Sequence, residues 1–156
     1  MNVDHHFEVR VEWQGNLGEG TRDYRSYTRD NLITAGSNPP IEGSSARAFR
    51  GSPHHWNPEE LMVAALSQCH MLSYLHVAAT NGIVVTSYSD DATGTMQQTS
   101  NGGGRFTSVT LNPVVQISSG DPELALALHA EASEKCFIAG SINFPVLHEP
   151  TVTLFP

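Results

Sequence analysis

The amino-acid sequence predicts an α+β fold in which helices and strands are segregated along the chain. Its N-terminal third alternates apolar with polar residues, its middle holds one long and almost wholly apolar helical segment, and its last third contains further strand patterns around a second helix. The expected order is β-β-β, long helix, β-β, helix, β. We therefore predict antiparallel sheets with a long buried central helix, in a single domain over residues 1–156.

The N-terminal third has the pattern of a β-meander. Residues 7–13, Phe-Glu-Val-Arg-Val-Glu-Trp, alternate with the period of a strand that buries one face. Further apolar positions mark one or two more strands before the loop at 36–40: Tyr24, Tyr27, Leu32 and Ile33.

The central helix has clear signals at both ends. Asn57 is a favourable cap, Pro58 suits the first helical position, and Glu60 stands three residues after the cap as in a capping box. Asn81-Gly82 is a typical stop. These signals predict a helix over 58–80. Because it is apolar nearly all round, it must be buried on most sides, and in so small a domain this indicates an intimate homodimer.

The last third is expected to contain two strands, a helix and a closing strand. Residues 83–96 and 105–117 have strand character and are joined across the turn-rich segment 99–104. Asp121-Pro122 begins a second helix that ends at Cys136. The alternating tail after Pro150 is expected to close the sheet.

Composition excludes several classes of function. Sixteen acidic and eight basic side chains give a net charge of -8, which repels a phosphate backbone, so we expect no nucleic-acid partner. The longest apolar stretches are expected to be far too short to span a bilayer, and residues 1–10 lack the pattern of a secretory signal. We therefore expect a cytoplasmic protein that uses no membrane.

The chain has two cysteines, Cys69 and Cys136. In a reducing cytoplasm such a pair is more often catalytic or redox-sensing than structural. Cys69 lies 12 residues past the Asn57 cap, too far for the helix N-terminus to lower its pKa much, so a buried core cysteine and a reactive one stay equally open. Cys136 stands at a helix end, where the chain can turn inward toward the long helix.

Histidines are not expected to take part in the chemistry. Neighbouring helix residues point about 100° apart, so a nucleophilic pair of Cys69 with His70 within one chain is not expected. We expect His76, His129 and His148 to be ordinary half-buried side chains. The His5-His6 and His54-His55 pairs lack the Cys/His grouping of a zinc site, and we predict no bound metal or cofactor.

The cysteine segments resemble those of the OsmC and organic hydroperoxide resistance proteins. The resemblance rests on Asn57-Pro58-Glu59-Glu60-Leu61 leading to Cys69, on the Cys136 segment with Ser141 behind it, and on the element order, over nearly the whole chain. It implies an OsmC-like fold and an intertwined homodimer. It also implies reduction of organic hydroperoxides, and often hydrogen peroxide, by a peroxidatic Cys69 and a resolving Cys136, reset by a dithiol reductant of the lipoyl type.

The resemblance also implies a Glu and Arg pair that stabilises the reactive thiolate. Glu59 matches the Glu, although a first-turn acid that favours the helix dipole is an equally simple reason for its presence. Glu59 and Cys69 are ten positions apart, about 15 Å of helical rise, so they cannot touch within one straight helix. Both can line one site if an antiparallel partner helix supplies one of them, which predicts a homodimer with shared active sites.

The arginine of this pair has several candidates. Arg50 and Arg47, on either side of Phe49, come first because they shortly precede the Asn-Pro-Glu motif. The other candidates lie earlier in the chain: Arg22, Arg25 and Arg29.

Two other functions remain open beside the peroxidase. One is a non-catalytic OsmC-like dimer that binds a small apolar ligand, and the other is a redox sensor whose disulfide reports oxidant. Large aromatic residues could wall an apolar pocket, although core packing is expected for most of them: Trp13, Phe49, Trp56 and Phe144.

Overall fold

The computed structural model describes residues 3–155 and contains two compact units, residues 1–61 and 62–156. It is a mixed α+β structure with three-stranded sheets and two α-helices. The predicted fold class is thus confirmed.

The first unit is built on a three-stranded antiparallel sheet. Strands β1 (Arg10–Trp13), β2 (Asn31–Thr34) and β3 (Ile41–Gly43) pair in chain order, as predicted for a meander. The sequence pattern did not mark β3, because three residues are too few to show a period of two. The short 3-10 helix η1 (Arg47–Phe49) follows before the long helix begins.

Helix α1 (Pro58–Thr80) has the predicted bounds. The Glu60 amide donates a hydrogen bond of 2.9 Å to Asn57 Oδ1, so Asn57 satisfies one of the free amides of the first turn. At the other end Gly82 takes a φ of 72°, which residues with a Cβ rarely adopt, and the chain leaves the helix there.

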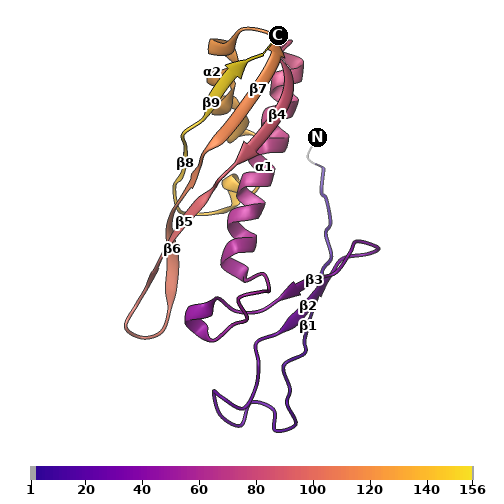
Figure 1. Cartoon of the computed structure of the whole chain (residues 1–156), viewed down its shortest axis with the longest axis vertical. Coiled ribbons are helices and arrows are strands. Elements are labelled where there is room, and N and C mark those ends of the chain that lie inside the picture. The colour runs from indigo at the N-terminus through magenta and orange to yellow at the C-terminus, as the bar shows by residue number, and fades with distance from the viewer. Residues whose placement is uncertain (1–2, 156) are drawn as a thin grey trace. The chain divides into compact units, whose positions relative to one another are not determined.

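The second unit contains two sheets, and short segments lead from one to the other between β4 and β5, β6 and β7, and β8 and β9 (Figure 1). One has the order β4-β7-β9 and the other β5-β6-β8. The pairs β7·β9 and β6·β8 are parallel, because helix α2 carries the chain back between them, and the remaining pairs are antiparallel. The elements are β4 (Val84–Asp90), β5 (Thr93–Gln98), β6 (Gly104–Leu111), β7 (Pro113–Ser119), α2 (Pro122–Glu134), η2 (Ala139–Ser141), β8 (Val146–His148) and β9 (Thr151–Leu154).

The predicted strands 83–96 and 105–117 are each broken in two, which corrects the sequence-based expectation. Asp90 stands opposite Pro113, which has no amide hydrogen to continue the ladder. The Asp90 Oδ1 atom instead accepts the Asn112 amide at 2.6 Å, and the Asn112 side chain donates to the Asp91 carbonyl at 2.9 Å. This local network replaces the ladder bonds and separates the two sheets.

Two apolar clusters form the core of the second unit. The larger joins α1, α2, β4 and β7 and contains Tyr74, Val77, Ala78, Ile83, Val115, Ile117, Ala125, Leu128 and Ala132. The smaller is formed by Leu66, Val109 and Leu111, with Phe106, Ile142 and Phe144 packed against it. In Figure 1, α1 accordingly runs alongside the strands of this unit.

Helix α1 buries only one stripe in the single chain. Its buried residues are Leu66, His70, Tyr74, Val77 and Ala78, at the three- and four-residue spacing of one helix face. Apolar side chains elsewhere on the helix stay accessible, with Leu72 57% and Met62 40% exposed. The expected burial on most sides is therefore not met within one chain.

Helix α1 is long and apolar enough to cross a membrane by length and composition, so the expectation that every apolar stretch is far too short is wrong. The core helix of a soluble protein meets the same criterion. Here the helix supplies Leu66, Tyr74 and Val77 to the core clusters, and it carries the buried imidazole of His70. Packing against the sheets thus accounts for the apolar character of the buried stripe of the helix.

The smaller cluster provides a test of the packing. Leu111 is fully buried, whereas Leu147 on β8 is 51% exposed. We expect Leu111→Ala to lower the free energy of unfolding by about 2–5 kcal/mol, because it removes buried methyl groups and leaves a cavity. Leu147→Ala, the matched control, should cost less than about 1 kcal/mol. Urea denaturation of both variants measures the difference, and equal losses would contradict the assignment of this core.

Candidate functional site: a thiol pair

The second unit brings the two cysteines together. Cys69 lies near the middle of α1 and is partly exposed, whereas Cys136 follows the end of α2 and is only 3% exposed. Both are free thiols, and Cys69 lies near enough to Cys136 to raise the pKa of the Cys136 thiol. Two neighbouring thiols can interconvert between a dithiol and a disulfide.

The chain around Cys136 is a tight turn that holds its sulfur in place. The Cys136 amide donates to the Ser133 carbonyl at 3.2 Å, and the Gly140 amide donates back to the Cys136 carbonyl at 3.0 Å. The Ala139 amide points at Cys136 Sγ, 3.5 Å away. Because these bonds belong to the backbone, the position of Cys136 depends mainly on how α2 ends and only weakly on side-chain rotamers.

The two thiols differ in their electrostatic environment. Burial raises the pKa of the Cys136 thiol to about 11, and the neighbouring Cys69 thiol acts in the same direction, while the Ala139 amide opposes both. Cys136 therefore stays protonated at neutral pH and is a poor first nucleophile. Cys69 is the more accessible of the two sulfurs.

The other predicted site residues belong to the first unit, residues 1–61. Glu59 lies in the first turn of α1, and its buried Oε2 atom has no hydrogen-bond partner among residues 3–155. A buried carboxylate oxygen normally has a donor, so this atom is open to a cationic partner. Arg47 belongs to η1, and Arg50 follows it with a φ of 64°, the left-handed conformation.

The structure distinguishes among the arginines of the first unit. The Arg29 guanidinium donates to the carbonyls of Tyr27 and Tyr24 at 2.7 and 2.6 Å and packs over both tyrosine rings, so it serves the loop between β1 and β2. Arg22 forms a surface ion pair with Glu19 at 3.4 Å. Within residues 3–155 the side chains of Arg25, Arg47 and Arg50 form no ion pair.

A cluster of three histidines lies in the second unit and was not predicted. His70, on α1, and His129, on α2, are 1% and 3% exposed, and His70 Nε2 lies 3.0 Å from His129 Nδ1. The ring of His148, on β8, lies 4.4 Å from that of His70. The expectation that His129 is an ordinary half-buried side chain is therefore wrong. Its position seven residues before Cys136 could have drawn attention to it, but its burial depends on three elements that meet only in the fold.

A model of the OsmC-like protein family matches residues 51–150, which include both cysteines. The chain belongs to this family. The solved structure of an OsmC-like protein of unknown function from Vibrio cholerae is 31% identical, with a TM-score of 0.84 over 94% of this chain and 99% of that chain.

Two more distant structures share the fold. One is an organic hydroperoxide resistance protein from Elizabethkingia anophelis, which is 16% identical, with a TM-score of 0.68 over 99% of this chain and 100% of that chain. The other is the organic hydroperoxide resistance protein OhrB of Bacillus subtilis, which is 20% identical, with a TM-score of 0.60 over 94% of this chain and 98% of that chain. No curated protein matches the chain.

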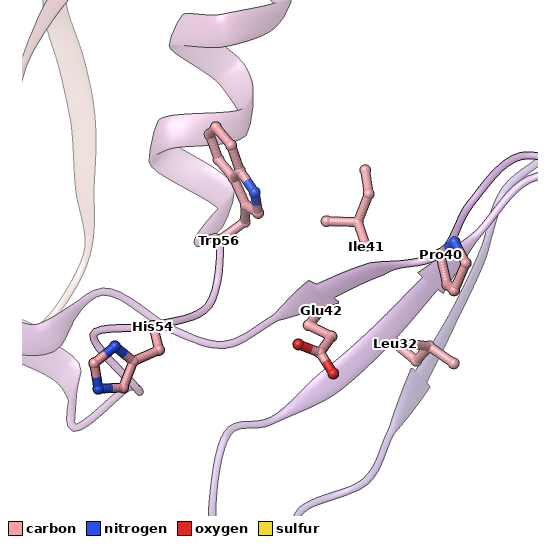
Figure 2. A pocket seen from close by; sticks show the side chains of 6 residues that line it. All are labelled: Leu32, Pro40, Ile41, Glu42, His54 and Trp56. Carbon is pink, nitrogen blue, oxygen red and sulfur yellow. The ribbon is translucent and has the colours of Figure 1, made fainter.

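Each unit of this OsmC-like chain has a surface pocket that neither cysteine lines. In the first unit a pocket of about 400 Å³ is formed by β2, β3 and the segment before α1, as Figure 2 shows, and Trp56 and Ile41 give it apolar walls. In the second unit a pocket of about 430 Å³ lies over α2 and β8 and is lined in part by His129 and His148. Phe144, one of the expected wall residues, packs in the core instead.

The described residues, 3–155, hold no group of three or more His, Cys, Asp or Glu side chains arranged to bind a metal ion. In the histidine cluster, the rings of His70 and His129 are stacked, and a hydrogen bond links one nitrogen of each ring.

The histidine cluster predicts acid sensitivity of the OsmC-like fold. Burial lowers the pKa of His70 to about 3 and that of His129 to about 4, from an ordinary value of 6.5. The unfolded chain therefore binds more protons below pH 6.5, so stability is full above that pH and falls as the pH drops toward 4.

We expect the free energy of unfolding to fall by about 4 kcal/mol between pH 7 and pH 5, about 2 kcal/mol for each of the two histidines, measured by urea denaturation at each pH. His76, which is exposed on α1, provides the control: His76→Gln should leave the slope unchanged, whereas His129→Asn should reduce it. A wild-type stability that is level from pH 7 to pH 5 would contradict the burial of neutral imidazoles.

Proposed function

We propose that this OsmC-like protein is a thiol peroxidase that reduces organic hydroperoxides, with hydrogen peroxide as a further substrate. The observation that carries the proposal is the contact between a partly exposed Cys69 and a buried Cys136 whose pKa is raised. Cys69 would be the sulfur that attacks the peroxide, and Cys136 would be a neighbouring, protonated thiol that reacts with the oxidised Cys69 in the next step. The names of the organic hydroperoxide resistance proteins that share the fold agree with this chemistry.

The reaction balances with these two thiols. The Cys69 thiolate attacks the distal peroxide oxygen, the O–O bond breaks, and the alkoxide takes a proton and leaves as the alcohol. Cys69 is now a sulfenic acid. The Cys136 sulfur attacks the Cys69 sulfur, the S–O bond breaks, and the hydroxyl leaves as water with the Cys136 proton. A dithiol reductant, which we propose to be of the lipoyl type, then reduces the disulfide by two thiol exchanges.

The working form in this proposal is a cytoplasmic, intertwined homodimer with shared active sites, in which residues 1–156 form one domain. The accessible apolar side chains of α1, such as Leu72 and Met62, support it, because an uncovered apolar helix face in a small protein favours a partner surface. A second copy of α1 would cover this face.

In such a dimer, Glu59 of one subunit and Cys69 of the other can line one site. The unpartnered Glu59 Oε2 supports a cationic neighbour, and we propose Arg50 or Arg47 for that role because their guanidinium groups have no ion pair among residues 3–155. A guanidinium held by Glu59 would stabilise the Cys69 thiolate.

Turnover tests the proposal against the two other functions. Reduced wild-type protein with cumene hydroperoxide and dihydrolipoamide should consume peroxide catalytically, and Cys69→Ser should abolish this because it removes the nucleophile. Cys136→Ser should still react once and then stop as a sulfenic acid, which mass spectrometry detects. A single stoichiometric oxidation of wild type would favour a redox sensor, and no reaction in a folded protein would favour a non-catalytic binder.

The arginine proposal has its own test. Arg50→Gln or Arg47→Gln should lower kcat/KM for the peroxide at least about tenfold, which corresponds to about 1.4 kcal/mol of lost thiolate stabilisation. Arg22→Gln is the matched control, since Arg22 forms a surface ion pair, and should stay within about twofold. Unchanged rates in both Arg50 and Arg47 variants would rule these two residues out.

A further inference from the structure

The buried histidine pair joins α1, which carries Cys69, to α2, whose C-terminal end leads to Cys136. His70 directly follows Cys69 on α1, and His129 precedes Cys136 by seven residues on α2. The 3.0 Å contact between His70 Nε2 and His129 Nδ1 is therefore a polar tie beside the thiol pair. Two further bonds join α1 to the α2 segment: Tyr74 Oη donates to the Ala125 carbonyl at 3.0 Å, and Ser73 Oγ donates to the Lys135 carbonyl at 3.5 Å.

The contact between the imidazoles can hold one proton but not two. One ring nitrogen must donate and the other accept, so the contact cannot stay closed when both rings are imidazolium. The outer nitrogens, His70 Nδ1 and His129 Nε2, are buried and have no hydrogen-bond partner among residues 3–155. A proton taken up by the outer nitrogen of the donor ring would therefore give an imidazolium whose outer N–H group is buried without an acceptor, and protonation of both rings would place two N–H groups against each other.

The neighbouring groups do not compensate such a charge. His148 on β8 lies beside His70, the Tyr74 ring stacks on His129 at 3.9 Å, and Tyr88 on β4 lies near Tyr74. Asp90, at the end of β4, is the acid whose charge reaches His148. Its carboxylate is already engaged by the Ser67 hydroxyl at 2.5 Å and by the Asn112 amide at 2.6 Å.

We infer that His70 and His129 are positioning residues for the thiol pair: their neutral, hydrogen-bonded contact holds α2 against α1 so that Cys136 reaches Cys69, and proton uptake opens this contact and slows coupling of the thiols. The inference deepens the proposed function and rests on it. The lowered pKa values of His70 and His129 agree, since burial in the closed contact disfavours the charged form. Acid would thus switch off resolution while Cys69 remains accessible.

A reaction without peroxide measures the coupling. One equivalent of 4,4′-dithiodipyridine forms a mixed disulfide with the partly exposed Cys69 and releases one thiopyridone. Cys136 then attacks the Cys69 sulfur, the bond to the second thiopyridone breaks, and that thiopyridone leaves with the Cys136 proton. The rate of this second, intramolecular release reports how well Cys136 is held beside Cys69, and the reagent also works in mild acid.

The matched variant is the double substitution His70→Gln/His129→Asn. The Gln amide takes the position of His70 Nε2 and the Asn amide that of His129 Nδ1, so a neutral hydrogen bond is retained but cannot titrate. At pH 7.5 we expect the double variant to close the Cys69–Cys136 disulfide, measured as the second thiopyridone release, at a rate within about threefold of wild type. Because the Cys136 thiol titrates alike in both proteins, the ratio of wild-type to double-variant rates isolates the histidines, and it should fall at least fivefold between pH 7.5 and pH 4.5.

His129→Leu keeps the side-chain volume roughly but removes the hydrogen bond, and it should slow disulfide closure at least tenfold at pH 7.5. The double variant, in which Asn at position 129 restores a hydrogen bond, should not show this loss. His76→Gln should match wild type at every pH. A rate ratio that is constant from pH 7.5 to pH 4.5, or a His129→Leu rate equal to that of wild type, would overturn the inference.

Hydrogen exchange of the wild type gives a second test if the double variant does not fold. After correction for intrinsic exchange rates, protection of α2 amides should fall below pH 5.5 while that of the β5–β6 pair persists. Equal protection of both down to pH 4.5 would also overturn the inference.

Peroxide turnover is measured separately, so the two proposals can fail independently. Fast, acid-sensitive disulfide closure without peroxide turnover would reject the peroxidase alone. Turnover with acid-insensitive closure would reject the histidine switch alone.

Discussion

The packing of α1 against α2 is the constraint on which the rest of this structure depends. The larger apolar cluster lies between these helices and the β4-β7-β9 sheet, and the thiols and the histidine pair both bridge the same two helices. A shift of α2 along α1 would therefore separate Cys136 from Cys69 and break the imidazole contact together. The distance between the thiols and the stability of the core therefore change together, because both depend on the same faces of α1 and α2.

Asp90 connects this contact to the architecture of the sheets. Its carboxylate accepts bonds from Ser67 on α1 and from the Asn112 amide where β6 gives way to β7, so one side chain ends a ladder and anchors the helix that carries Cys69. The charge of Asp90 also raises the pKa of His148, so this side chain has both a structural and an electrostatic role. The residue at which the strands break thus also helps to hold α1 in place.

The sequence predicted what local signals determine and missed what only tertiary contacts determine. The bounds of α1 were correct because Asn57, Pro58 and Gly82 act within one turn of the helix ends. The break at Asp90 and Asn112 was missed, since it depends on a bond between residues 22 positions apart. The histidine cluster was missed because three elements must converge before any of its rings is buried. The thiol pair came from resemblance, and its contact is visible only in the fold.

The unequal burial of the two thiols sets a sequence of events for the proposed reaction. A sulfur that is 3% exposed and has a pKa of about 11 meets a bulky hydroperoxide late, whereas a partly exposed sulfur meets it first. The high pKa would also delay disulfide formation unless the second thiol is held close, because only a small thiolate fraction is present at any moment. Proximity must compensate for low nucleophilicity. This requirement explains why a rigid polar tie between α1 and α2 would be useful next to Cys69, in a core that apolar side chains could otherwise have filled.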